Sequence, residues 1–402
     1  MSLSQSSERS RSLVPVMAAA GISGVAGYVV LVLAARVLDP AVNASFLVFW
    51  GAVYAAFGAL VGLTTETTRA VFSSGDRGST AVFPVLIGIG GSAAALVGVS
   101  GVWWAPLLFG DAWSGLLLAM VTGIVLFSLQ SGLNGAAAGT SSWTAYSLSL
   151  GSEAVMRLVL CTVAAVVGGH LVGLAWAVVL ACSTWIGWVL ARRDYRRFVR
   201  VRISGSRSGL ARRMLVACAA TGSSALLLVG YPVLLRVTTP ADVFAGAAPI
   251  VLSVSLSRAP LLVPLGIYQN VLVTRVIRDG LQVLRPIVGG LGVVAAVGSA
   301  AAWWAGPWLL HVINPHYDVS GQVFAGLVLT AGLVAALTIT GAATVALDRH
   351  ATYLAGWLVA TAVAALTLLL PGSLESRVLW SLAAGPLAGI AVHVGGGLAR
   401  RS

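Results

Sequence analysis

The sequence carries little charge for its length. Only 9% of its 402 residues are Asp, Glu, Lys or Arg, and 58% are hydrophobic, whereas soluble domains carry about 25% charged residues. So few charged side chains cannot cover the surface of a water-soluble globule. The short alternating segments of a membrane β-barrel are also missing. What is left is a polytopic α-helical membrane protein.

Other absences limit the kinds of binding site and reaction that the sequence allows. Lysine is absent, so all 24 basic residues are arginine. The three cysteines lie in apolar segments without metal-ligand spacing. His311, His316 and Asp318 share one loop without such spacing either, so we expect no metal site. No Walker A sequence or other enzyme signature is present, and we therefore expect neither an enzyme nor a bound cofactor.

Long apolar runs recur from end to end of the chain, each near the ~20 residues that cross a bilayer. They predict an all-α membrane protein with about twelve transmembrane helices. The expected spans are 13–35, 44–65, 81–104, 114–137, 143–168, 171–191, 212–236, 242–273, 287–311, 321–346, 351–371 and 376–398.

Arginine is distributed unevenly between the two sets of loops. If the N-terminus is cytoplasmic, the outer loops hold only Arg36, Arg236 and Arg377, while nine arginines fall within the inner segment 192–213. This bias predicts that both termini are cytoplasmic. It also explains the net charge of +12 without nucleic acid, which we do not expect as a partner. The basic segment should be attracted to membrane lipids with anionic headgroups.

Two short motifs recur at a spacing of 200 residues, each at the outer end of an expected helix. They are ARVLDPA (35–41) with LRVTTPA (235–241), and WWAPLL (103–108) with WWAGPWLL (303–310). Such a repeat predicts two six-helix lobes related by a pseudo-two-fold axis along the membrane normal, with the substrate site between them near the midplane. The expected parts are a lobe at 1–191, a cytoplasmic linker at 192–213 and a lobe at 214–402.

Three charged residues lie well inside expected spans, namely Glu153, Arg157 and Arg258. An ionised group at the bilayer centre costs about 2.5–3.5 kcal/mol on insertion scales, and such residues usually mark substrate or ion pathways. All three are therefore candidate substrate-binding residues. Arg258 has no acid within four residues, so its partner is either distant in the sequence or a bound anion.

Glu153 and Arg157 allow two interpretations. In the first they form an intrahelical ion pair, because an acid four residues before a base is a favourable arrangement that reduces the cost of burying both charges. In the second, Arg157 binds an anionic ligand while Glu153 orients it or binds a coupling ion, H+ or Na+. Tyr146 and Ser149 lie on the same helix face and join the candidate substrate-binding residues.

A second charged pair lies near the inner edge of the second span. Glu66 and Arg69 stand in the segment TTETTRAV, where solvation at the headgroup level makes charge inexpensive. They are either a solvated helix end or a possible inner gate.

Several segments together resemble a known family. They are AARVLDP (34–40), GSEAVMRLVL (151–160), LSRAPLLVPLGIYQNVLV (256–273) and GPWLLHVINPHYDVSGQVF (306–324). In this order they are similar to segments of polysaccharide flippases in the multidrug/oligosaccharidyl-lipid/polysaccharide exporter superfamily, except that Asp39 stands where glycine is usual. The resemblance implies a two-lobed transporter in which Arg157 and Arg258 meet the pyrophosphate of a lipid-linked saccharide.

We therefore expect a transporter that flips a polyprenyl-(pyro)phosphate-linked saccharide from the inner to the outer leaflet for assembly of a cell-envelope polysaccharide. It would lie in a bacterial plasma membrane, beside glycosyltransferases or a polymerase of the same pathway. The first alternative is an ion-coupled small-molecule or multidrug antiporter of the same superfamily, with Glu153 as its ion-binding acid. The second is a membrane scaffold for a glycan-assembly complex.

Overall fold

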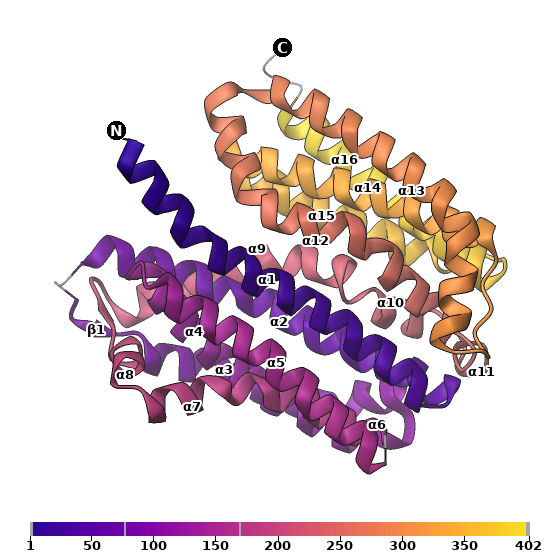
Figure 1. Ribbon diagram of the computed structural model, residues 1–402, viewed down its shortest axis with the longest axis horizontal. Coiled ribbons are helices and arrows are strands. Elements are labelled where there is room, and N and C mark those ends of the chain that lie inside the picture. The colour runs from indigo at the N-terminus through magenta and orange to yellow at the C-terminus, as the bar shows by residue number, and fades with distance from the viewer. Residues whose placement is uncertain (1–2, 76–77, 169, 399–402) are drawn as a thin grey trace. The chain divides into compact units, whose positions relative to one another are not determined.

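The computed structural model describes residues 3–75, 78–168 and 170–398, and most of them are helical (Figure 1). The long elements are α1 (Leu3–Val37), α2 (Pro40–Ser74), α3 (Phe83–Phe109), α4 (Trp113–Gly139), α5 (Trp143–Val167), α6 (Leu171–Leu180) with α7 (Thr184–Ala191), α9 (Arg207–Leu228) with α10 (Tyr231–Val237), α12 (Ala248–Asp279), α13 (Leu284–Ile313), α14 (Gly321–Ala346), α15 (His350–Thr367) and α16 (Leu374–His393). The short ones are η1 (Gly110–Ala112), η2 (Ala181–Ser183), α8 (Arg193–Val199), α11 (Ala241–Phe244), η3 (Leu281–Val283), η4 (Val394–Leu398) and the strands β1 (Thr80–Ala81) and β2 (Arg202–Ile203).

The number of membrane spans follows from these helices. Within the described residues, ten helical stretches are long and apolar enough to cross a membrane, and the bent pair α9–α10 is an eleventh. One of the ten, Phe83–Gly139, contains both α3 and α4. These two helices form an antiparallel hairpin, because Gly90 faces Ser128 while Gly101 faces Leu117. That stretch therefore supplies two spans, and the described residues hold the twelve expected ones.

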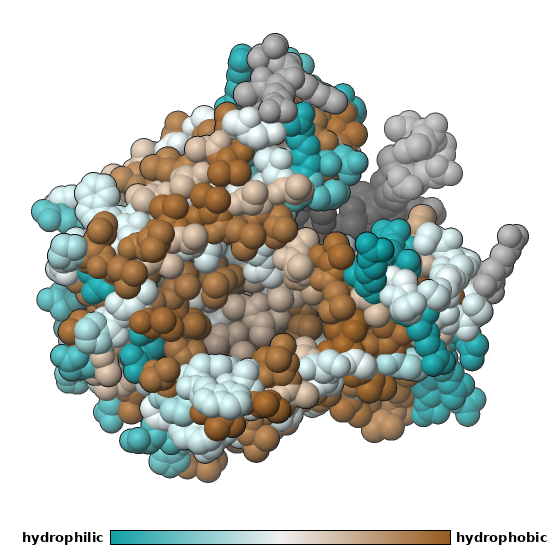
Figure 2. Space-filling model, turned by 180° about the vertical axis from the view of Figure 1, so that it is seen from behind, coloured by the Kyte–Doolittle hydropathy of each residue, from teal (hydrophilic) through white to brown (hydrophobic). Residues whose placement is uncertain are grey.

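Hydrophobic side chains are exposed along the outer faces of these helices. On α5 the exposed residues include Val155, Val159, Val163 and Val166. Figure 2 shows large hydrophobic areas on the surface, beside separate groups of hydrophilic residues. In water such a surface would be unfavourable, and in a bilayer it contacts lipid. The protein is thus an all-α, multi-pass membrane protein.

The chain forms two compact units. Unit 1 contains Met1–Leu38 and Phe49–Ala225, and unit 2 contains Asp39–Val48 and Leu226–Ser402. The short Asp39–Val48 segment belongs to unit 2, where the Asn43 Nδ2 donates a hydrogen bond of 2.7 Å to the Tyr317 hydroxyl. The division of the chain into functional lobes at 1–191 and 214–402 stays a prediction.

The segment 192–213, expected to link two lobes, lies within unit 1. It forms α8 and β2, and β2 pairs in antiparallel fashion with β1. The side chains of Tyr195, Phe198 and Ile203 are buried. These three apolar and aromatic residues, spaced between the arginines, anchor the segment to unit 1, while its role as a cytoplasmic linker between two lobes stays a prediction.

The two units repeat one plan of helix packing. In unit 1, α3 packs on α4, α4 on α6, and α5 on α6; in unit 2, α13 packs on α14, α14 on α16, and α15 on α16 (Figure 1). The repeated motifs fall at equivalent places. The first pair ends α1 and α10, and the second lies in the last turns of α3 and α13. This agreement supports the six-plus-six architecture expected from the repeat.

Within unit 1, α2 and α9 pack closely through small residues. A methyl group added at Gly62 would meet the backbone of Ala217 and Cys218. The Thr221 hydroxyl donates a hydrogen bond of 2.7 Å to the Ala59 carbonyl. Small residues allow such close helix contacts in membranes, where association depends on van der Waals packing and interhelical hydrogen bonds.

We predict that Gly62→Ala destabilises the protein by about 1–3 kcal/mol, because the added methyl group must separate α2 from α9. Gly88→Ala is the matched control, since Gly88 lies in α3 with no atom near the place of an added methyl group. Thermal unfolding of both variants in the same detergent measures the difference. Equal melting temperatures for the two variants would contradict the close packing.

Candidate functional site

Glu153 and Arg157 form a buried ion pair on α5. The Arg157 Nη1 lies 3.4 Å from the Glu153 Oε1, and the two side chains are only 4% and 9% exposed. Glu153 follows the start of the helix by about ten residues, which corresponds to a depth of roughly 15 Å at 1.5 Å per residue. The pair thus lies where the sequence placed it, inside a membrane-spanning helix.

Arg157 has further partners on two other helices of unit 1. Its Nη1 donates a hydrogen bond to the Tyr54 hydroxyl on α2, and its guanidinium lies 5.6 Å from the centre of the Tyr54 ring. Its Nη2 donates to the Ser23 carbonyl oxygen at 3.4 Å and to the Ser23 hydroxyl at 3.3 Å on α1. One guanidinium therefore connects α1, α2 and α5, and we call Ser23, Tyr54, Glu153 and Arg157 the unit 1 network.

Sequence reasoning did not identify Tyr54 and Ser23. They lie 103 and 134 residues before Arg157, and no local pattern connects them to it. The number of hydrogen-bond donors on Arg157 could have indicated further partners. A guanidinium carries five N–H donors, and one carboxylate cannot accept all of them when buried. A tyrosine and a serine at similar depth in neighbouring spans were the natural additional acceptors.

The other two polar residues of the α5 face lie nearer its N-terminal end. Ser149 is fully buried, and its hydroxyl has no hydrogen-bond partner among the described residues. Tyr146 is partly buried and packs edge-on against Trp143. Ser149, Glu153 and Arg157 of the expected polar face are thus buried in unit 1. The role of this face in binding substrate stays a prediction.

Arg258 binds the backbone where a helix of another span ends. The expected span 212–236 consists of two helices, α9 and α10. They meet at a bend of 66°, because Gly230 and Pro232 interrupt the helix. The Arg258 Nη1 donates hydrogen bonds to the carbonyls of Leu227 and Leu228 at 3.1 and 2.9 Å. A cation at the last carbonyls of a helix is favourable, since they carry partial negative charge.

The structure therefore places the two candidate arginines in different units with different partners. Arg258 also lies 5.3 Å from the centre of the Tyr231 ring and is only 5% exposed. Its distant partners thus include the backbone at the end of α9 and this ring. Binding of an anionic ligand by Arg157 or Arg258 stays a prediction.

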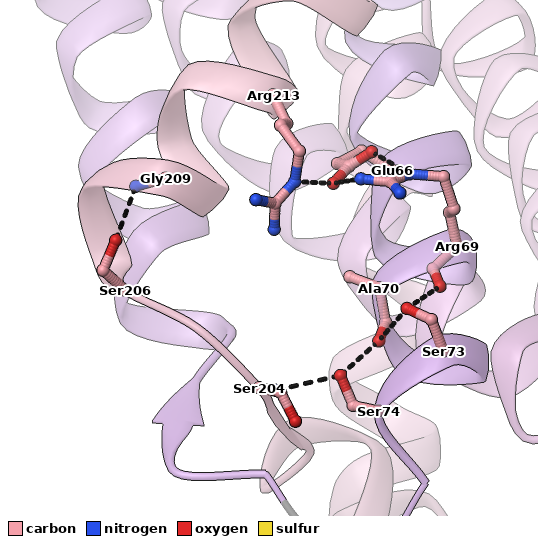
Figure 3. A network of polar contacts seen from close by, with 9 residues as sticks. All are labelled: Glu66, Arg69, Ala70, Ser73, Ser74, Ser204, Ser206, Gly209 and Arg213. Atoms are coloured by element: carbon pink, nitrogen blue, oxygen red, sulfur yellow. Dashed lines mark hydrogen bonds and ion pairs between the residues drawn. The ribbon is translucent and has the colours of Figure 1, made fainter.

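Glu66 and Arg69 form a third charged cluster, near the C-terminal end of α2 (Figure 3). The Arg69 Nε and Nη2 donate to the two carboxylate oxygens of Glu66, both at 2.8 Å. Arg213 of α9 adds a hydrogen bond of 2.6 Å from its Nε to the same carboxylate. The sequence did not indicate Arg213, which is 147 residues away. The cluster ties α2 to α9 within unit 1, and a gating role stays a prediction.

No metal centre is formed by the described residues. Among them, no group of three or more His, Cys, Asp or Glu side chains is arranged to hold a metal ion. The three cysteines are free, and Cys161 and Cys182 are buried. The charged chemistry of the described interior therefore comes from carboxylates and guanidiniums.

We predict that Arg157→Met destabilises the protein by about 3–5 kcal/mol, because it leaves the buried Glu153 carboxylate without its counter-ion. The double variant Glu153→Gln/Arg157→Met should recover much of this loss, since neither charge then remains. Thermal unfolding of the two single variants and the double variant forms a double-mutant cycle. Strictly additive effects would show that the two side chains do not interact.

The comparisons with known proteins bear on both family and fold. No family model matches the chain. It is 39% identical to the uncharacterized protein Rv1510 of Mycobacterium tuberculosis (strain H37Rv) over 97% of this chain and 92% of that protein. It is 36% identical to the uncharacterized protein Rv3630 of the same organism over 96% of this chain and 91% of that protein.

Solved structures with the same fold are transporters. A multidrug resistance MATE family transporter of the MOP superfamily, in its inward-facing conformation, matches with a TM-score of 0.67 and 16% identity over 95% of this chain and 94% of that chain. A MOP superfamily transporter from Pyrococcus furiosus matches with a TM-score of 0.67 and 14% identity over 96% and 94%. The expected superfamily fold is thus present, while membership of its polysaccharide flippase branch stays a prediction. The chain belongs to the family of the uncharacterized mycobacterial proteins Rv1510 and Rv3630, and it has the two-lobed fold of MOP superfamily transporters.

Proposed function

We propose that the protein is a proton-coupled transporter that moves a small organic molecule across the membrane by alternating access. The observation that carries this proposal is the unit 1 network, in which one buried carboxyl group, that of Glu153, holds a guanidinium that connects three helices. The fold supports it, because both inward-facing and outward-facing MATE family multidrug transporters match the chain over most of its length. This is the alternative of the same superfamily that the sequence left open.

Protonation of Glu153 would change the balance of charge in the network. While Glu153 is ionised, it neutralises Arg157 across 3.4 Å. When it takes up a proton, the buried guanidinium loses its counter-ion, which is strongly unfavourable in a medium of low dielectric constant. Arg157 must then shift toward Tyr54, Ser23 or water, and the contacts between α1, α2 and α5 change with it. A proton can in this way bias two arrangements of one unit.

The same geometry favours H+ over Na+ as the coupling ion. A sodium ion bound to the Glu153 carboxylate would lie within a few ångströms of the Arg157 guanidinium, where like charges repel strongly. A proton adds no separate ion to the site and needs no further oxygen ligands. Ser149, one turn nearer the inner side, supplies a single hydroxyl. The network therefore suits a titrating acid better than a bound metal cation.

We predict that purified protein in proteoliposomes transports a fluorescent organic cation when a pH gradient is imposed, and that Glu153→Gln removes this coupling. Glutamine keeps the size of the side chain but cannot exchange a proton. Asp348→Asn is the matched control, because the Asp348 side chain is 94% exposed and asparagine tolerates its left-handed backbone (φ 60°). Transport driven by sodium alone, or unchanged coupling in Glu153→Gln, would contradict proton coupling at this residue.

A lipid-linked saccharide is the second candidate substrate, and one feature of unit 2 favours it. An apolar groove of about 200 Å³ lies among α12, α13 and α14. Its wall is made of small and apolar residues, including Pro260, Gly298, Ala302, Gly306 and Phe324. Such a groove suits an isoprenoid tail. Against this candidate, the arginines expected to meet the pyrophosphate already have partners within their own units.

A single assay distinguishes the two candidate substrates, the small organic molecule and the lipid-linked saccharide. The same proteoliposomes can carry a fluorescent polyprenyl-pyrophosphate saccharide in the inner leaflet, and its appearance in the outer leaflet is measured by chemical quenching. We expect no protein-dependent flipping if the substrate is a small soluble molecule. Flipping that is lost in the double variant Arg157→Gln/Arg258→Gln would instead assign the lipid-linked substrate. A protein inactive in both assays would fit the scaffold alternative.

A further inference from the structure

A polar pocket lies at the inner end of unit 1, away from the unit 1 network. Its volume is about 450 Å³, and it lies between the first turn of α5, the short helix α8 and the inner part of α1. The residues that line it are Pro15, Ser141, Ser142, Trp143, Thr144, Ala145, Leu148, Arg192, Asp194, Tyr195, Arg197 and Phe198. The proposed transport function does not use this pocket.

Two arginines give the pocket a net positive charge. The Arg192 guanidinium lies 5.7 Å from the centre of the Trp188 ring, and that of Arg197 lies 5.0 Å from the centre of the Phe198 ring. The ion pairs found in the described part of the chain include neither arginine. Asp194 also lines the pocket, so its three charged side chains sum to one positive charge. Both cations are therefore positioned by neutral aromatic faces and remain available to an anion.

The start of α5 adds backbone donors to this positive charge. The first N–H groups of a helix lack partners within the helix, and here Tyr146 makes the first intrahelical bond, to the Ser142 carbonyl. The Ser142 side chain does not cap the helix. Its hydroxyl instead accepts a hydrogen bond of 3.2 Å from the Arg197 Nη2. Trp143, Thr144 and Ala145, which carry these first amides, line the pocket together with the arginines, and such helix starts hold the phosphate at many phosphate sites.

The walls of the pocket are held in place by aromatic contacts. The Tyr195 hydroxyl donates a hydrogen bond of 3.1 Å to the Ala145 carbonyl, and burial raises the pKa of this phenol, so it stays protonated. The Tyr195 ring stacks on Trp188 at 5.2 Å. The Trp188 indole N–H donates a hydrogen bond of 2.8 Å to the Ser152 hydroxyl on α5. α7 and α8 are thus fixed against α5, and the pocket is preorganised.

An apolar path leads from the pocket along the outer face of α5. Leu148 lines the pocket and is 38% exposed. Val155, Val159 and Val163 follow it at spacings of seven, four and four residues, which places them on the same helix face, and all three are exposed. A phosphate bound in the pocket could therefore carry acyl chains that lie along this path into the membrane. A soluble phosphate compound would make no use of it.

We propose that this pocket binds the phosphate group of an anionic phospholipid from the inner leaflet. Arg192, Arg197 and the first amides of α5 hold the phosphate, and the acyl chains follow Leu148 and the valines of α5. The charge bias of the loops predicts that this end of α5 lies on the cytoplasmic side, where anionic lipids attract basic segments. The bound lipid fixes α8 and the basic segment to the membrane surface.

Native mass spectrometry of the full-length protein in a neutral detergent tests this site. Phosphatidylglycerol is titrated against the wild-type protein, the double variant Arg192→Gln/Arg197→Gln and the matched control Arg200→Gln/Arg207→Gln. The control removes the same charge from exposed positions of the same segment that do not line the pocket. We expect the pocket variant to weaken binding about tenfold or more, and the control to change it little.

Three further arms keep the result decisive. Phosphatidylcholine should bind much more weakly, because its headgroup has no net charge. Inorganic phosphate and glycerol phosphate should not displace the lipid at comparable concentrations, and Leu148→Gln should weaken lipid binding by placing a polar group on the acyl path. Equal losses of lipid binding in the pocket variant and the control variant would show only a general attraction to a basic segment, and this result would overturn the proposal. Displacement by soluble phosphate, with no effect of Leu148→Gln, would overturn the assignment to a lipid.

Discussion

The cost of burying charge in a membrane is the constraint on which the arrangement of helices within each unit depends. A guanidinium cannot lose its charge, so every buried arginine must be given acceptors by the helices around it. Arg157 is given a carboxylate, a phenol and a serine, while Arg258 is given the carbonyls that end α9. Each arginine therefore fixes the relative positions of the helices that supply its partners.

The chemical nature of these partners decides what each arginine can do. The acceptor opposite Arg157 is a carboxyl group, which can take up a proton and change the charge of the network. The carbonyls of Leu227 and Leu228, which accept hydrogen bonds from Arg258, cannot take up a proton in this way. The same kind of residue thus stabilises a titratable contact on α5 and the carbonyl end of α9. The titratable carboxyl group of Glu153 is the reason to propose ion coupling in the α5 network.

Composition and apolar runs were sufficient to predict the fold, because a span needs about twenty apolar residues whatever its tertiary contacts are. The apolar run by itself did not locate the bend between α9 and α10, since Gly230 and Pro232 interrupt the helix without interrupting the apolar run. Within the candidate site, only the contact between residues of the same helix was predicted. Glu153 and Arg157 follow from their spacing, but Tyr54, Ser23 and Arg213 come from distant parts of the chain. Such partners depend on how helices pack, which one sequence does not specify locally.

The two halves of the chain repeat the same helix order but differ where charge is involved. α15, which occupies in unit 2 the place of α5, carries no charged residue between 351 and 367. α1, which corresponds to α9 with α10, continues through Leu3–Val37 as one helix and needs no cation at a break. A duplicated fold would not require such asymmetry for stability alone, because α15 forms its span without an ion pair. The asymmetry is expected if one unit carries the element that changes charge during transport and the other keeps its shape.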